Sequence, residues 1–198
     1  CSILSSALVK DQKVIGTYNG AYALRVYEAK AIMEIDFNRI RDESTTHEIK
    51  LPQRNHILNP NSATRADIRD EMLRAEYLAV DIECWLDDNG TWRLACVGFS
   101  DRPDRSLVIS AESTDALLDI KLLCETKGPK RVFQNGQFDV TVLRDNGIFV
   151  KDYAWDTMYA HHALLAECAG GEDEMAVLKG KKKMSVFNKG LAFQTSIY

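Results

Sequence analysis

The chain has 198 residues, which is room for one ordinary domain and a smaller additional piece. Its hydrophobic share of 45% and charged share of 27% are typical of a globular protein, and no apolar run approaches the roughly 18 residues of a membrane span. The formal net charge of −4 argues against a broadly basic surface for nucleic acid, although it leaves room for local basic patches.

The cysteines favour a reducing compartment. Their number is odd, no two are spaced C-x-x-C and most lie in apolar runs; they are Cys1, Cys84, Cys96, Cys124 and Cys168. This usage predicts buried free thiols rather than disulfides or a zinc site. We therefore expect a cytoplasmic protein.

The first third of the chain predicts a small folded piece followed by a connection. Residues 13–27 predict a strand, a turn at Asn19-Gly20 and the start of a helix, and residues 28–43 predict one helix. Residues 44–63 contain two prolines, three asparagines and little periodicity, so we expect a linker or an extended arm. A short capped helix should follow at 64–76.

From Tyr77 onwards the pattern predicts a mixed α/β domain. Three apolar runs at 77–85, 94–100 and 106–110 are joined by short polar connections and predict an antiparallel meander. The elements expected after them are a helix at 114–127 capped by Thr114, a strand at 132–134, a helix at 136–146 ended by Gly147, a strand at 148–150, a helix starting at Asp156, and a loop at 170–183.

Asp81 and Glu83 lie two residues apart in the first of these strands, so their side chains share one face at roughly 6–7 Å along the strand. Two carboxylates on an otherwise apolar strand are costly to bury without a partner, and a divalent cation would compensate them. The alternative is a strand end where two acids meet solvent or a basic partner. The pair alone does not decide between these interpretations.

A second polar element, Asn135-Gly136-Gln137-Phe138-Asp139, follows the strand at 132–134. Asp139 falls in the first turn of the next helix, and Phe138 is placed to anchor that turn in the core. An acid in a first turn commonly serves only to stabilise the helix N-terminus. Taken alone, this element favours that structural role.

Together, D-x-E on the first strand and N-x-x-F-D at a strand-to-helix junction resemble the first two motifs of the DEDD 3′-5′ exonucleases. This superfamily includes the proofreading domains of family A DNA polymerases and the ribonuclease D-like enzymes. The resemblance covers about residues 77–198. Asp156-Thr157-Met158 with Ala160-His161-His162, and the ending from Lys189 to Tyr198, resemble the polymerase branch, especially phage-type enzymes.

The resemblance implies a ribonuclease H-like mixed sheet of about five strands flanked by helices. It implies that Asp81, Glu83 and Asp139 are catalytic and hold two Mg²⁺ or Mn²⁺ ions, while Asn135 and Phe138 bind substrate. The implied reaction releases nucleoside monophosphates from a single-stranded DNA 3′ end, with a polymerase domain in the same parent chain, in a bacterial or phage-infected cell. Crowding of the three acids predicts a raised pKa for at least one.

The family's third motif, Y-x-x-x-D, should follow Tyr198. We therefore expect the domain to be incomplete in this piece of a longer protein, and the 198-residue chain to hydrolyse DNA poorly. Val14 to Arg25 resembles the end of a uracil-DNA glycosylase-like domain, but Asn19-Gly20 stands where that family has His-Pro, which puts glycosylase chemistry in doubt. The expected division is 1–45, the tail of that preceding domain; 46–76, a linker with a short helix; and 77–198, the exonuclease domain.

Two alternatives to a proofreading nuclease remain at this point: a ribonuclease D-like enzyme that trims RNA, and a non-catalytic nucleic-acid-binding remnant. The intact Asp81, Glu83 and Asp139 argue against the remnant. His161 and His162 are adjacent on a helix and point roughly 100° apart, so we expect one packed and one exposed residue rather than a metal site. Lys181–Lys183 could contact phosphate, although a solvated loop is the simpler interpretation.

Overall fold

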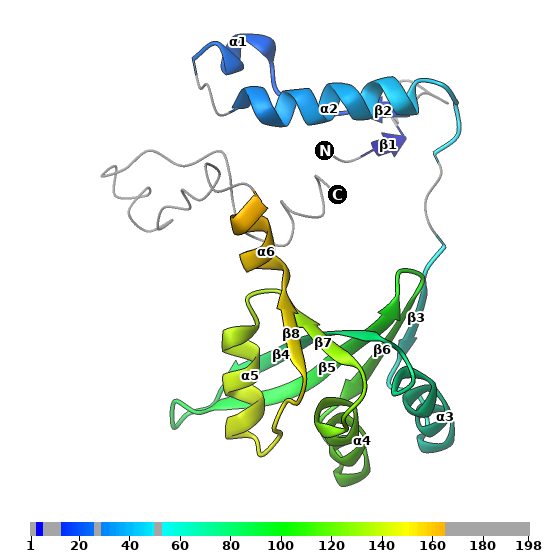
Figure 1. The fold of residues 1–198 in the computed structure, drawn as a ribbon, viewed down its shortest axis with the longest axis vertical. Coiled ribbons are helices and arrows are strands. Elements are labelled where there is room, and N and C mark those ends of the chain that lie inside the picture. Colours follow the sequence, from blue (N-terminus) through cyan, green and yellow to red (C-terminus); the bar gives the residue numbers. More distant parts are fainter. Residues whose placement is uncertain (1–2, 6–12, 26–28, 50–52, 165–198) are drawn as a thin grey trace. The chain divides into compact units, whose positions relative to one another are not determined.

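The computed structural model describes residues 3–5, 13–25, 29–49 and 53–164 (Figure 1). The chain divides into two compact units, one formed by residues 1–51 with 161–198 and the other by residues 52–160. Within the described residues, no helix combines the length and the apolar character needed to cross a membrane.

The described part of residues 1–51 contains a two-stranded antiparallel sheet and two helices. Its elements are β1 (Ile3–Ser5), β2 (Lys13–Ile15), α1 (Gly20–Ala23) and α2 (Ala29–Glu43). Asn19 caps α1 by accepting a hydrogen bond from the backbone N–H of Ala21, so the predicted strand, turn and helix start are confirmed. The ammonium group of Lys13 lies 2.8 Å from the carboxylate of Glu43 and links β2 to the end of α2.

The larger unit is built on a six-stranded mixed sheet with the order β3-β6-β5-β4-β7-β8. The strands are β3 (Asn55–Leu58), β4 (Tyr77–Leu86), β5 (Trp92–Arg102), β6 (Arg105–Ser110), β7 (Lys130–Phe133) and β8 (Tyr153–Asp156). β4, β5 and β6 form the predicted antiparallel meander, whereas β3, β7 and β8 pair in parallel with their neighbours. The predicted fold class, a mixed α/β sheet flanked by helices, is confirmed.

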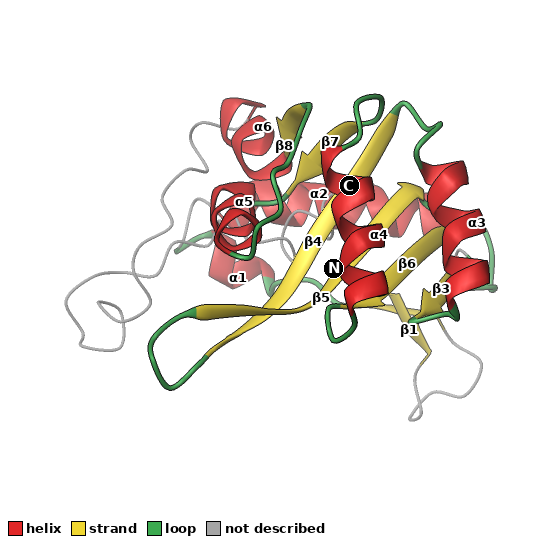
Figure 2. Ribbon diagram, turned by 90° about the horizontal axis from the view of Figure 1, so that it is seen from below, coloured by secondary structure: helices red, strands yellow, loops and turns green. Residues whose placement is uncertain are grey.

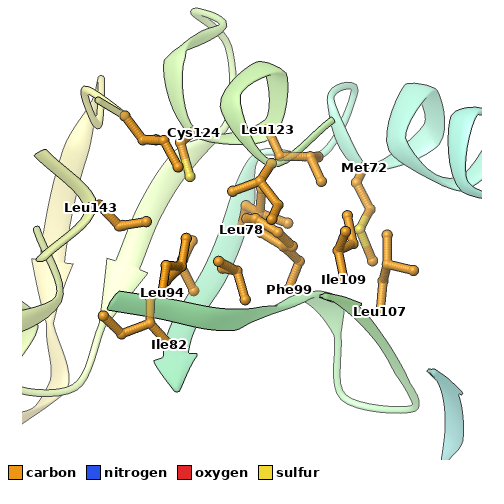
Figure 3. Close-up of a cluster of buried hydrophobic side chains, with 14 of the residues drawn as sticks. Met72, Leu78, Ile82, Leu94, Phe99, Leu107, Ile109, Leu123, Cys124 and Leu143 are labelled. Carbon is orange, nitrogen blue, oxygen red and sulfur yellow. The ribbon is translucent and has the colours of Figure 1, made fainter. Parts of the chain in front are cut away.

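Alternation along the strands places one face of the sheet in the core. In β4, Leu78, Val80 and Ile82 are buried while the residues between them are exposed. Figure 3 shows Leu78 and Ile82 in the same cluster as side chains of the neighbouring strands and helices, including Phe99, Leu123 and Leu143. The opposite side of β4, which we call the open face, carries Asp81 and Glu83.

Helices cover the core face of the sheet (Figure 2). They are α3 (Ser62–Met72), α4 (Thr114–Glu125) and α5 (Gly136–Asp145), and α6 (Thr157–Leu164) follows β8. Asn61 caps α3, and the cap of α4 is Ser113, not the predicted Thr114, because the hydroxyl of Ser113 accepts the backbone N–H of Ala116. Gly147 ends α5 with φ at +77°, where a residue with a side chain would be strained.

Charged groups tie the helices to one another and to the sheet. Asp119 of α4 is buried and accepts hydrogen bonds from Arg65 and Arg69 of α3. Arg131 of β7 is fully buried, and its guanidinium donates to the backbone oxygens of Leu123, Thr126 and Pro129 at the end of α4. These buried charges are compensated by partners, as buried ionic groups must be.

Two sequence-based predictions about the sheet are wrong. Residues 55–58, expected to be part of a linker or arm, form β3, which lies parallel to β6 at the edge of the sheet. Residues 148–150, expected to be a strand, are irregular: Ile148 is buried in the core, and Phe149 and Lys151 donate backbone N–H groups to Glu125 and Cys124 of α4. The sixth strand is β8 instead, and the described sheet has one strand more than expected.

Candidate active site

The open face of β4 presents Asp81 and Glu83 side by side. Because the buried Val80 and Ile82 alternate with them, the two acids point away from the core, as predicted. Asp81 pairs with Gly98 of β5, and Glu83 pairs with Cys96. The cross-strand neighbours are therefore small, and the carboxylates remain accessible.

Asp139 comes to this site from α5. The pairing of Ala79 with Val132 is the last between β4 and β7, so β7 ends beside the part of β4 that carries Asp81. The chain then turns into α5, and Asp139, in the first turn of that helix, is only 7% exposed. A parallel strand followed directly by a helix thus brings a third acid close enough to Asp81 for the two charges to interact.

The electrostatics show that the three acids influence one another. Burial, and then the negative charge of Asp81, raises the pKa of Asp139 to about 6. Partial desolvation, and then the charge of Glu83, raises the pKa of Asp81. The predicted raised pKa is confirmed for two of the three carboxyls. Such crowding of like charges destabilises the ionised forms unless a cation or a proton compensates them.

The turn between β7 and α5 is under tight steric control. Asn135 has a left-handed backbone conformation with φ at +57°, which asparagine tolerates better than most residues. At Gly136 an added Cβ would lie 2.3 Å from the Cβ of Phe133, so only glycine fits. The turn that precedes Asp139 therefore has one conformation available, and this fixes where α5 begins.

Asp156, at the end of β8, holds that turn, a role that the sequence does not predict. Its carboxylate accepts the backbone N–H groups of Asn135 at 3.0 Å and Gly136 at 2.8 Å, the hydroxyl of Tyr153 at 2.8 Å and the backbone N–H of Met158 at 2.9 Å. Burial alone would raise the pKa of Asp156, but these hydrogen bonds outweigh burial and lower it. The carboxylate of Asp156 thus caps both α5 and α6. The sequence predicts only that a helix starts at Asp156.

Phe138 does not anchor the turn in the core, contrary to prediction. Its ring is 43% exposed and meets the ring of Trp92 edge to face, with centroids 5.3 Å apart. The apolar face of α5 is filled instead by Val142 and Leu143, one turn further along. Phe138 is accordingly available at the surface beside Asp139, where its expected contact with substrate stays a prediction, as does that of Asn135.

The other sequence candidates behave as structural residues. His161 is buried and His162 is exposed, as expected. Cys84, Cys96 and Cys124 are free thiols. Burial raises the pKa of Cys84, and the charges of Asp139 and Glu83 raise it further, so this thiol stays protonated beside the acids. Cys1, Cys168, Lys181–Lys183 and the ending after Lys189 lie outside the described residues.

The residues fit a divalent cation by charge and chemistry. Three carboxylates, of which Asp81 and Asp139 have raised pKa values, form an oxygen-rich, anionic donor set of the kind that Mg²⁺ and Mn²⁺ prefer. In the part of the chain that the structure describes, no three acidic, histidine or cysteine side chains are gathered closely enough to hold an ion as they stand. The fit is therefore one of donor chemistry, and Asp81, Glu83 and Asp139 stay predicted ligands.

A family comparison decides what kind of site this is. The family model described as 3′-5′ exonuclease matches residues 60–170, which is more than half of the chain. The chain belongs to this 3′-5′ exonuclease family. The matched segment contains β4, α5 and Asp156, so this part of the chain is a 3′-5′ exonuclease domain of the DEDD type. No curated protein matches the sequence.

Solved structures with a similar fold include polymerase and ribonuclease chains. The POL domain of Pol1 from M. smegmatis is 10% identical (TM-score 0.48; 72% of this chain and 25% of that chain covered). Escherichia coli RNase D is 12% identical, with a TM-score of 0.47 over 73% of this chain and 37% of that chain. Trypanosoma brucei RNase D in complex with RNA U12 is 15% identical, with a TM-score of 0.46 over 69% of this chain and 54% of that chain. The exonuclease spans less than two thirds of each of these chains.

Proposed function

We propose that the exonuclease removes nucleotides from the 3′ end of single-stranded DNA as the proofreading domain of a longer DNA polymerase. The observation that carries the proposal is the charge interaction of Asp81 with both Glu83 and Asp139, within a segment that matches the 3′-5′ exonuclease family. The matching family is named for DNA polymerase A, which favours DNA over RNA and a polymerase domain in the same parent chain.

The three acids would hold two divalent cations, Mg²⁺ or Mn²⁺, at the terminal phosphodiester. When bound, such ions lower the pKa of a water molecule and neutralise the charge that develops on the attacking and leaving oxygens. The protein itself supplies position: β4 fixes Asp81 and Glu83, and the locked turn before α5 fixes Asp139. Accurate placement of the acids accounts for much of the rate of hydrolysis, since a misplacement of about 1 Å can lower the rate on the order of 100-fold.

Asn135 and Phe138 would position the end of the strand. Both follow β7 at the point where Asp139 enters the site, and the half-exposed ring of Phe138 offers a base a surface for stacking. The contact of that ring with Trp92 holds it in one orientation. An aromatic surface beside a set of acids suits a single strand whose terminal base is unpaired.

The test is hydrolysis of 5′-labelled oligonucleotides by the longer parent protein and by the 198-residue chain, with Mg²⁺ or Mn²⁺. A ladder that shortens from the 3′ end, abolished by EDTA and by a blocked 3′ hydroxyl, is the expected result. We expect DNA to be degraded faster than RNA of the same sequence. Faster cleavage of RNA would support a ribonuclease D-like role instead, and binding without cleavage would support a non-catalytic remnant.

A further inference from the structure

The open face of β4 continues beyond the acids into the hairpin that joins β4 and β5. This hairpin projects from the rest of the sheet (Figure 2). Along β4, Asp81, Glu83 and Trp85 occupy every second position. The pairing with β5 is irregular between Glu83 and Cys84, but Cys84 still packs against the core, so Trp85 lies on the same face as Glu83. Trp85 pairs with Arg93 of β5, which places the side chains of Trp85 and Arg93 together on this same face.

Both side chains are about half exposed to solvent. The indole of Trp85 is 52% exposed. The neighbouring Trp92 lies on the opposite face of the hairpin, where it packs against Phe138 of α5. The two tryptophans therefore differ in environment: Trp92 belongs to the contact between hairpin and helix, whereas Trp85 presents its ring beside the acids.

A hydrogen bond to Asp87 restrains the side chain of Arg93. Its Nε donates to Asp87 at 2.7 Å, and Asp87 also accepts the backbone N–H groups of Asn89 and Thr91 at the tip of the hairpin. With Nε engaged, the guanidinium keeps its remaining amino groups for another partner. A positive charge next to an exposed indole, on a face otherwise marked by acids, suits a ligand that combines phosphates with planar rings.

We propose that Trp85 and Arg93 form a binding subsite for the single-stranded nucleic acid upstream of the scissile phosphate. The inference rests on the proposed function and extends it from the terminal nucleotide to the strand behind it. If the acids hold the terminal phosphodiester, the rest of the strand leaves the site on its 5′ side. Trp85 then stacks on an upstream base, and Arg93 pairs with a backbone phosphate. Stacking accepts any base, so this subsite gives affinity without sequence preference.

The experiment measures binding apart from catalysis. Fluorescence anisotropy with a labelled oligothymidylate in EDTA gives the Kd of the full chain and its variants at several salt concentrations. Trp85→Ala should weaken binding on the order of tenfold to a hundredfold, the usual loss for one stacked base, and Trp85→Phe should restore most of it. Arg93→Ala should reduce the slope of log Kd against log salt by about 0.7, the value for one phosphate contact on a single strand.

Matched controls are present in the chain. Leu86 is 54% exposed on the opposite face of the same hairpin, so Leu86→Ala should leave the Kd unchanged. Arg102 is as exposed as Arg93, lies in the same strand and is likewise paired with an aspartate, so Arg102→Ala should keep the salt slope. Circular dichroism and thermal melting establish that each variant is folded.

Each outcome either supports the subsite or overturns it. Binding by Trp85→Ala equal to wild type, an equal loss in Leu86→Ala, or full binding by Trp85→Leu in place of a stacking ring would each overturn it. A parent protein that fails to shorten DNA from its 3′ end would overturn the proposed function itself. To separate the two, Trp85→Ala should cleave the p-nitrophenyl ester of thymidine 5′-monophosphate, which has no upstream strand, at the wild-type rate.

Discussion

Replacing Asp139 by asparagine should make the protein more stable at neutral pH while removing its activity. The carboxyl of Asp139 is buried beside Asp81, and its pKa is raised from 3.8 to about 6. At about 1.36 kcal/mol for each pH unit, this difference corresponds to about 3 kcal/mol of cost to the folded state when Asp139 is ionised. Asparagine has nearly the same shape and no charge, so Asp139→Asn should recover about 2–3 kcal/mol.

The pH dependence has a definite sign. Because the folded pKa of Asp139 lies above the unfolded value, its favourable contribution is present below pH of about 4 and is lost as the pH rises through about 6. The advantage of Asp139→Asn should therefore be near zero at pH of about 4 and reach its full value at pH of about 7. For a chain of this size the corresponding rise in Tm is roughly 5–10 °C.

Urea unfolding in EDTA, followed by circular dichroism at both pH values, measures the effect. Asp145 lies on the same helix with a half-exposed carboxylate, and Asp145→Asn should change the unfolding free energy by less than about 0.5 kcal/mol. A less stable Asp139→Asn at neutral pH, or an advantage that does not shrink on acidification, would refute the crowding of acids from which the proposed metal site is inferred.

Four further perturbations follow from the same geometry. Gly136→Ala should cost about 1–3 kcal/mol in urea unfolding and lower kcat, because the new Cβ would lie 2.3 Å from the Cβ of Phe133. Asp156→Ala should cost about 3 kcal/mol or more by leaving four donors without their acceptor, and the wild-type advantage should fade in acid as the pH falls through the lowered pKa of Asp156. Asp119→Ala should cost about 3–5 kcal/mol, since Arg65 would stay buried without its carboxylate; thermal melting measures this. Mn²⁺ should raise the Tm of wild type but not that of Asp139→Asn, as a melting titration would show.

The elements that the sequence predicted correctly are those whose partners are near in the chain. The meander of β4, β5 and β6 is joined by short turns, and strands of that kind pair with their neighbours. β3 was missed because its stability comes from β6, some fifty residues further along, and not from its own polar sequence. The apolar run at 148–150 predicts a strand, yet backbone N–H groups in and next to it bond to α4 and Ile148 packs in the core. An apolar, buried segment therefore need not pair with a neighbouring strand.

The candidate site shows the same limit. The two-residue spacing of Asp81 and Glu83 and the helix position of Asp139 could be predicted from the sequence, and in the structure the charge of Asp81 interacts with those of Glu83 and Asp139. The long-range role of Asp156 could not be read, because its bonds to Asn135 and Gly136 exist only once β7 and β8 lie side by side. Nothing in the order of residues distinguishes it from an ordinary helix cap.

The most direct test of the central claim is the rate of 3′-terminal hydrolysis of single-stranded DNA by Asp81→Asn, Glu83→Gln and Asp139→Asn, measured in the parent protein with Mg²⁺. Each variant should lose at least about 100-fold in kcat while remaining folded, because each removes one charged group from a preorganised site. Asp145→Asn should keep the wild-type rate. A wild-type rate in any of the three acid variants would contradict the assignment of the active site.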